Sequence, residues 1–212
     1  MKVLLVNGSP RKDGCTYTAL MEAAKTLNHE GIGTEFFWIG NEPIQGCIAC
    51  RRCKETGFCH AGEDVNEFRK LAADADGFIF GTPVYYAAAN GSLISFMDRL
   101  FFSEAMGNGG KTFFMKPAAA VVSARRAGTT AAFDQVNKYF TISQMPIVSS
   151  RYWNMVHGMT SEDVLKDEEG LYTMRVLGRN MAYILKCLEA GVKAGVPLPI
   201  NETPVRTNFI RE

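Results

Sequence analysis

The sequence has almost no excess charge of either sign, and this limits the partners that it can have. It carries 23 Lys and Arg against 22 Asp and Glu, for a net charge of +1 in 212 residues. So balanced a charge offers no electrostatic footprint for nucleic acid or for an anionic membrane surface. No apolar run approaches the roughly 20 residues that span a bilayer, and the run at 3–6 is too short for a signal peptide. We therefore expect a cytoplasmic protein with no nucleic-acid or membrane partner.

Residue patterns for hydrolytic and nucleotide-triphosphate chemistry are also missing. The three histidines form no Ser-His-Asp or His-x-x-x-His arrangement, so no hydrolytic nucleophile is indicated. Residues 109–112 resemble the end of a Walker A loop, but Ala105 stands where that motif needs its first glycine. The remaining composition, 47% hydrophobic and 21% charged, is typical of a globular domain. We expect a single domain over 1–212.

Apolar segments alternate along the chain with segments of helical periodicity. Short buried strands are predicted at 1–7, 34–39, 77–82, 117–123 and 146–148. Pro83 is expected to end the third strand, and a C-terminal helical segment at about 160–195 carries a long amphipathic helix. Five strands alternating with helices predict an open, doubly wound parallel α/β sheet with helices on both faces and right-handed crossovers. In such sheets ligands bind outside the carboxyl ends of the strands.

The turn after the first predicted strand has the features of an anion site. Residues 8–16 lead directly into a helix, whose N-terminal N–H groups favour a negative charge. Ser9 and Thr16 add hydroxyl groups, and Arg11 adds a positive charge. A phosphate group would fit there. The alternative is an ordinary polar turn with Thr16 near the helix cap.

The turns after the third and fourth predicted strands would lie at the same edge. Residues 81–91 place Tyr85 and Tyr86 beside small residues, so the backbone can pass along the edge of a planar heterocycle. Residues 123–130 are again small and polar, and they would close over the same ring. The alternative for the tyrosines is ordinary packing or a subunit contact. For the Arg125-Arg126 pair the alternative is a solvated surface.

Four of the six cysteines fall within thirteen residues, in a long connection at 41–63. They are Cys47, Cys50, Cys53 and Cys59. A disulfide scaffold would spread its cysteines through a short secreted chain, so this cluster indicates metal, iron–sulfur or redox chemistry. Cys15 and Cys187 stand alone, and Cys187 is expected to be a buried apolar residue in the last helix.

The spacing of the four cysteines leaves three interpretations open. Cys-x2-Cys-x2-Cys-x5-Cys is a compact run like those that ligate a [4Fe–4S] cluster, although His60 stands where ferredoxin-like runs often have proline. Zinc is the second interpretation, but structural zinc sites prefer two separated pairs of ligands. The third is that the thiols hold nothing.

Three segments in this order carry a resemblance to a known family. They are Gly8-Ser9-Pro10-Arg11 with Thr16, Gly81-Thr82-Pro83-Val84-Tyr85, and Phe96-Met97-Asp98-Arg99. Together they are similar to the NAD(P)H-dependent FMN reductase family of flavodoxin-like proteins. The cysteine loop at 41–63, running on to Glu63-Asp64, looks like that of the family's iron–sulfur flavoprotein branch. Residues 167–170 and 177–180 look like its C-terminal helix, so the resemblance covers nearly the whole chain.

The resemblance implies a flavodoxin-like fold that binds FMN without a covalent link. By position, the phosphate would be held by Ser9, Arg11, Cys15 and Thr16. The isoalloxazine would be bordered by Pro83, Val84, Tyr85 and Tyr86, and its pyrimidine end by Ser123, Ala124, Arg125 and Gly128. Cys15 departs from the relatives, which more usually carry Asn or Ser. Because a thiol is a weak donor, phosphate binding there would rest more on backbone N–H groups.

The activity that the resemblance implies is that of an FMN-dependent NAD(P)H oxidoreductase. Electrons would pass from NAD(P)H through bound FMN to a quinone, a flavin or an electron carrier. The cofactor carries the redox chemistry, so no catalytic side chain is assigned. One alternative is an iron–sulfur flavoprotein that relays single electrons between partner proteins. Another is a redox or metal sensor whose cysteine loop controls assembly.

A homodimer or homotetramer is expected. A second subunit often completes the flavin edge in the fold that the chain resembles. Tyr85-Tyr86 and Phe101-Phe102 are the candidate contacts.

Overall fold

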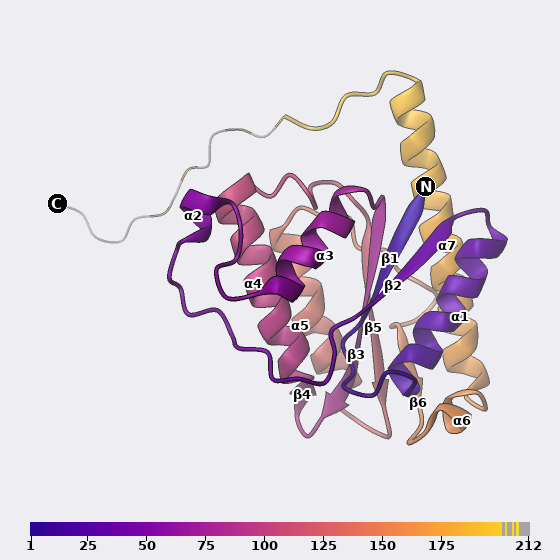
Figure 1. The fold of residues 1–212 in the computed structure, drawn as a ribbon. Helices are drawn as coiled ribbons and strands as arrows, with labels where there is room; N and C mark the ends of the chain where they lie inside the picture. Colours follow the sequence, from indigo (N-terminus) through magenta and orange to yellow (C-terminus); the bar gives the residue numbers. More distant parts are fainter. Residues whose placement is uncertain (201, 203–204, 206, 208–212) are drawn as a thin grey trace.

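Five parallel strands form the central sheet of the computed structural model, in the order β2-β1-β3-β5-β6 (Figure 1). The structure describes residues 1–200, 202, 205 and 207. The strands are β1 (Lys2–Asn7), β2 (Gly33–Trp38), β3 (Gly77–Tyr85), β5 (Ala118–Ala124) and β6 (Met155–His157). A two-residue strand, β4 (Ala88–Ala89), pairs antiparallel with the end of β3. The predicted doubly wound sheet is confirmed, and the last residues of the predicted 1–212 domain lie outside the described part.

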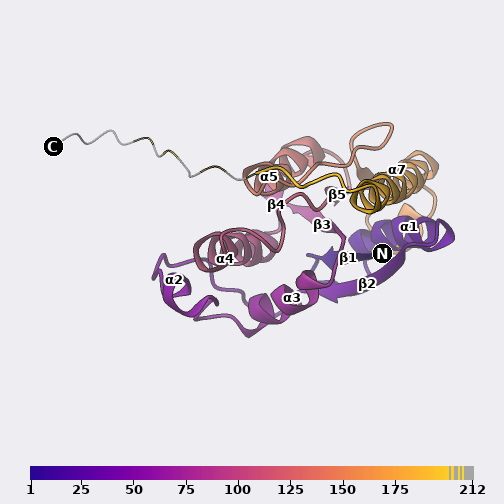
Figure 2. The same cartoon turned by 90° about the horizontal axis from the view of Figure 1, so that it is seen from above.

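The sheet is covered on both faces, as a parallel sheet must be if its strands are apolar throughout. The helices are α1 (Cys15–His29), α2 (Cys53–Thr56), α3 (Glu63–Ala73), α4 (Gly91–Asn108), α5 (Thr129–Ile142), α6 (Ser161–Val164) and α7 (Glu168–Lys193). Figure 2 shows α1 and α7 on one face and α3, α4 and α5 on the other. Each face has its own buried apolar cluster, and β5 is buried along its whole length between the two.

The face under α3, α4 and α5 is packed largely with phenylalanine. Phe68 of α3 lies 5.6 Å from Phe96 of α4 and 6.0 Å from Phe80 of β3, measured between ring centroids, and both pairs are edge to face. Such aromatic contacts add to the burial of large apolar area. They hold α3 and α4 firmly against β3, and these two helices carry the residues around the cysteine loop.

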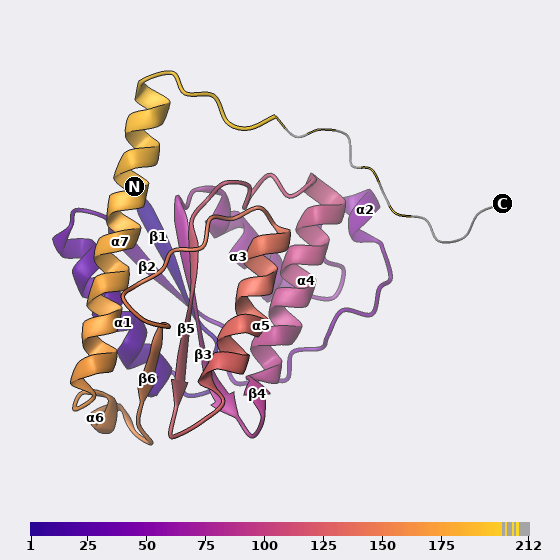
Figure 3. The same ribbon diagram turned by 180° about the vertical axis from the view of Figure 1, so that it is seen from behind.

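The strand boundaries differ from the sequence prediction in two places. β3 does not end at Pro83 but continues to Tyr85, because its end pairs with β4 and Pro83 needs no N–H donor to stay beside β5. The fifth strand is β6 at 155–157, whereas residues 146–148 contribute only an isolated bridge between Ile147 and Ala118. β6 is short and lies at the sheet edge beside α7 (Figure 3).

The cysteine of the last helix, α7, does not face the core. Cys187 is exposed, so the expectation of a buried residue is wrong. Leu185, two positions earlier, is buried, and a step of two residues turns a helix through more than half a circle. None of the helices in the described residues has the length and apolar character needed to cross a membrane.

Candidate functional site

The loops after β1, β3 and β5 meet at the carboxyl edge of the sheet, as predicted. The Gly8 N–H donates to the Gly81 carbonyl at 2.8 Å, and the Asn90 side-chain amide donates to the Gly8 carbonyl at 2.6 Å. The Thr16 and Ser123 hydroxyls are hydrogen-bonded at 2.8 Å. These contacts tie the β1–α1 segment to β3, to the N-cap of α4 and to β5.

Backbone groups of the β1–α1 loop are held in place from both sides. The Ser9 N–H donates to the Asn7 side chain at 3.1 Å, and the Ser9 carbonyl accepts from the Trp38 indole at 2.7 Å. The Arg11 N–H donates to the Ser9 hydroxyl, while the Arg11 side chain is exposed. The N-cap of α1 is Gly14, which provides no side-chain acceptor for the first turn. These helix N–H groups are therefore available to an anion.

Two of the predicted phosphate residues have specific partners. Thr16 is buried in the first turn of α1, two residues after the N-cap Gly14, and its hydroxyl is hydrogen-bonded to Ser123. The Cys15 thiol lies 3.6 Å from the Gly158 carbonyl, and burial raises the pKa of this thiol. A raised thiol pKa keeps Cys15 neutral, so it does not repel an anion bound at the start of α1.

The residues at the end of β3 and in the loop after it differ in exposure at the same edge. Pro83 is buried and Val84 half-buried, whereas Tyr85 is exposed and Tyr86 is fully exposed in a left-handed conformation with φ 56°. Gly128, with φ 95°, packs against this loop: a Cβ there would come 3.0 Å from the Val84 side chain. The loops after β3 and β5 therefore lie in contact.

The remaining predicted residues follow β5. Ser123 and Ala124 are buried at the end of the strand. Arg125 and Arg126 are exposed. The structure thus brings the predicted residues of all three loops to one edge, with their side chains ranging from buried to fully exposed.

Three residues of this edge were not predicted from the sequence. Asn90 caps α4, Asn7 ends β1, and Trp38 ends β2. Asn90 had a recognisable signal, because Asn before Gly91 and Ser92 is typical of a helix N-cap. Asn7 and Trp38 act through contacts with the chain at Ser9, which no local pattern reveals.

The four clustered cysteines line a pocket on the outer side of α4, apart from the carboxyl edge. The loop leaves the carboxyl end of β2 and runs past α4 to α2 (Figures 1 and 3). The pocket has a volume of about 380 Å³, part of it open to solvent, and its lining includes Cys47, Cys50, Cys53, Cys59, Arg51 and Arg99. Among the described residues, no three His, Cys, Asp or Glu side chains already converge on one metal position. The loop therefore brings the four cysteines to one pocket without gathering their sulfur atoms around one point.

The thiols of this pocket differ in exposure. Cys53 is buried and Cys59 half-buried, whereas Cys47 and Cys50 are exposed. Burial raises the pKa of the Cys53 thiol, and the neighbouring cysteines raise it further. Because cysteine ligates a metal as the thiolate, metal binding at Cys53 would have to release this proton.

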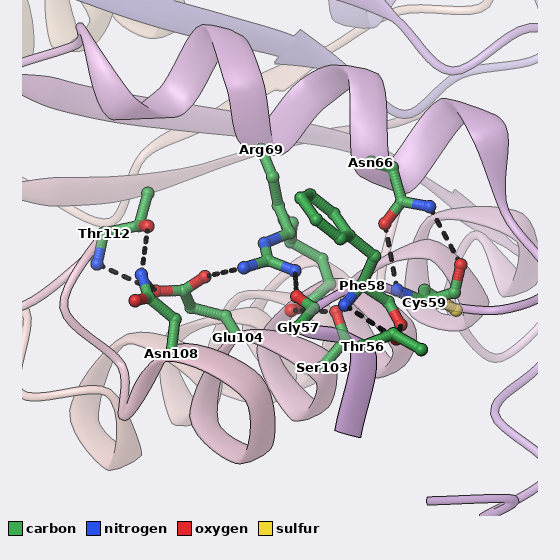
Figure 4. Close-up of polar contacts among 11 residues, drawn as sticks. Thr56, Gly57, Phe58, Cys59, Asn66, Arg69, Ser103, Glu104, Asn108 and Thr112 are labelled. Atoms are coloured by element: carbon green, nitrogen blue, oxygen red, sulfur yellow. Dashed lines mark hydrogen bonds and ion pairs between the residues drawn. The ribbon is translucent and has the colours of Figure 1, made fainter. Parts of the chain in front are cut away.

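The base of the cysteine loop is held by a polar network that is partly buried (Figure 4). The Asn66 side chain both donates to the Cys59 carbonyl at 2.8 Å and accepts from the Cys59 N–H at 2.9 Å. The Arg69 guanidinium donates to the Gly57 carbonyl and forms an ion pair with Glu104 at 2.7 Å. α3 and α4 together therefore fix the position of the loop.

The fold and the carboxyl edge define a flavodoxin-like protein. A solved flavodoxin from the domain Archaea aligns with a TM-score of 0.58 at 14% identity, over 88% of this chain and 99% of that chain. A family model described as NADPH-dependent FMN reductase matches residues 1–160. The chain belongs to this FMN-binding family, which confirms the resemblance seen in the sequence.

Two curated relatives of this chain are iron–sulfur flavoproteins. The iron–sulfur flavoprotein MJ1083 of Methanocaldococcus jannaschii is 33% identical over 199 residues, covering 89% of this chain and 100% of that protein. A second iron–sulfur flavoprotein of the same organism, MJ0731, is 30% identical over 197 residues, covering 88% and 98%.

Proposed function

We propose that this chain is an iron–sulfur flavoprotein that transfers electrons between NAD(P)H and partner proteins through bound FMN and a [4Fe–4S] cluster. The observation that carries the proposal is the single pocket lined by all four clustered cysteines, in a chain that also has the flavodoxin-like edge. The names of the two similar iron–sulfur flavoproteins support it. When bound, the two groups supply two-electron and one-electron redox chemistry.

The carboxyl edge fits FMN by its chemistry. The uncapped first turn of α1, the Ser9 loop and the Arg11 side chain offer hydrogen bonds and positive charge to the phosphate. Val84 and Tyr85 would border the ring, and the loop ending at Gly128, which packs against Val84, would close its pyrimidine end. The chain would orient the flavin through these residues.

The cysteine pocket fits the cluster by its donor set. Four thiols are provided within one loop, and Asn66 and Arg69 hold the base of that loop in place. In this proposal Cys47, Cys50, Cys53 and Cys59 are the four ligands. Hydrogen bonds and burial around such sulfur atoms tune the cluster.

A second candidate function is an NAD(P)H oxidoreductase that reduces a quinone or a free flavin without a protein partner. Membership of the NADPH-dependent FMN reductase family favours it. Steady-state NAD(P)H oxidation with a small quinone and no added protein would support this candidate. A requirement for a stoichiometric partner protein would support electron transfer. A homodimer or homotetramer stays a prediction for either function.

The proposal is tested by the absorption spectrum and metal content of protein purified without air. We expect flavin absorption together with about four irons and four sulfides per chain. Flavin without iron, or zinc in place of iron, would contradict the cluster and leave the reductase candidate. No flavin after reconstitution with FMN would contradict both candidates.

Gly8→Ala is expected to weaken FMN binding at least tenfold, about 1.4 kcal/mol. A Cβ at Gly8 would lie 2.7 Å from the Gly81 carbonyl oxygen and 2.7 Å from Leu93, so the loop must move. Overpacking of this kind also costs about 1–3 kcal/mol of stability. Fluorescence titration with FMN measures the affinity, with Gly91→Ala as the control because a Cβ there meets open space. Equal FMN affinity in Gly8→Ala and wild type would contradict the placement of the phosphate.

A further inference from the structure

Two buried arginines stand beside the cysteine loop, and only one of them has a counter-charge. Arg69 and Arg99 are 9% and 6% exposed. Arg69 is paired with Glu104 at 2.7 Å. Arg99 forms no ion pair with any carboxylate among the described residues. The pocket wall therefore contains a buried positive charge that the described chain does not neutralise.

The guanidinium of Arg99 is aimed into the cysteine pocket. Its Nε donates to the Cys59 sulfur at 3.3 Å, and one terminal nitrogen donates to the Gln45 carbonyl at 3.3 Å. The other terminal nitrogen is buried and has no hydrogen-bond partner. Gly62 makes the room for it, because a Cβ there would lie 1.8 Å from that nitrogen.

An unpaired buried cation is costly, so this arrangement calls for an anion. Removing a charge from water without a partner costs several kcal/mol, which paired charges and hydrogen bonds offset. The other cation in the pocket wall, Arg51, is exposed and needs no such partner. Arg99 contacts the sulfur of a proposed ligand and has a free donor beside it. A thiolate-held cluster would supply the missing negative charge and sulfur acceptors.

We propose that Arg99 is the internal counter-charge of the cluster and raises its reduction potential. This inference rests on the proposed function. The hydride that NAD(P)H supplies carries two electrons, so the bound flavin would pass them to the cluster one at a time and release its protons to solvent. The cluster would give each electron to a partner protein before the next one arrives. Each electron would add one negative charge to the cluster, with no proton taken up there. A fixed positive charge that donates to Cys59 stabilises the reduced cluster more than the oxidised one.

The test is a redox titration of the full chain, loaded with FMN and cluster, in wild type and in Arg99→Gln. We expect the reduced-to-oxidised ratio at a given potential to fall at least tenfold in the variant, a midpoint lower by about 59 mV for a one-electron couple. Arg99→Lys retains the charge and is expected to shift the midpoint less. Arg51→Gln removes a charge from the same wall at an exposed position, where solvent screens it, so its shift is also smaller. Electron paramagnetic resonance follows the cluster, and absorption follows the flavin.

A second measurement covers the case in which Arg99→Gln does not hold a cluster. Wild-type protein containing isotope-labelled arginine is reduced, and pulsed paramagnetic resonance is used to detect nitrogen coupled to the cluster. We expect a guanidinium coupling that is absent in Arg99→Lys. A wild-type cluster without this coupling, or an unchanged midpoint in Arg99→Gln, overturns the role of Arg99 and leaves the proposed function standing. Wild-type protein that holds no iron contradicts the proposed function itself, and the role of Arg99 with it.

Discussion

Glu104→Gln is expected to lower the free energy of unfolding by about 3–5 kcal/mol. Glu104 is 1% exposed, and its carboxylate pairs with Arg69 while accepting from the Thr112 N–H at 2.9 Å and the Asn108 amide at 2.8 Å. The neutral amide leaves the Arg69 guanidinium buried without a counter-charge. Urea denaturation at a fixed FMN concentration measures the change.

The double variant Arg69→Met with Glu104→Leu is the matched control. Replacing both partners of a buried ion pair by apolar residues removes the unpaired charge, so this variant is expected to be more stable than Glu104→Gln. Arg69 also donates to the Gly57 carbonyl at the base of the cysteine loop. The double variant is therefore expected to regain stability but not full iron content. Equal urea midpoints for Glu104→Gln and wild type would contradict a stabilising role for the pair.

Cys50→Ala is expected to abolish iron binding, a loss of about four irons per chain, while FMN content stays unchanged. Cys50 is exposed, so its removal takes away no buried contact and the fold should be retained. Iron and flavin analyses of anaerobically reconstituted protein, with circular dichroism, measure the outcome.

Cys187→Ala is the control with the same change at another exposed thiol, on α7 and far along the chain from the loop. It is expected to retain both iron and flavin. Full iron content in Cys50→Ala would remove Cys50 from the ligand set. Loss of iron in both variants would indicate a general effect of thiol removal rather than ligation.

The sheet was predictable because the residues of its inner strands form short apolar segments that can be recognised without knowledge of the rest of the chain. β1, β3 and β5 are short and largely apolar on both faces, a pattern that is typical of buried parallel strands. β6 has three residues, of which only Val156 is buried, so a more apolar segment at 146–148 was predicted in its place. The extension of β3 past Pro83 depends on pairing with β4, which is a contact between chain segments rather than a local pattern.

The loops at the carboxyl edge were predictable for a similar reason, whereas the polar network under the cysteine loop was not. Strand order determines which turns meet, so the neighbouring positions of Thr16 and Ser123 followed from the fold. Charged side chains are rarely buried, and nothing local marks Arg69, Arg99 and Glu104 as exceptions. Their burial becomes evident only once α3, α4 and the cysteine loop are assembled.

Helix α4 contacts both candidate sites, so its length helps to determine the distance between them. Its N-cap, Asn90, holds Gly8 at the carboxyl edge of the sheet, and Arg99 nine residues later contacts Cys59. At 1.5 Å per residue these positions are about 14 Å apart along the helix axis. Because an α-helix of this length does not stretch, α4 acts as a rigid spacer. In the proposed function, the distance that an electron would cross between the two sites would therefore depend on the number of residues in a single helix.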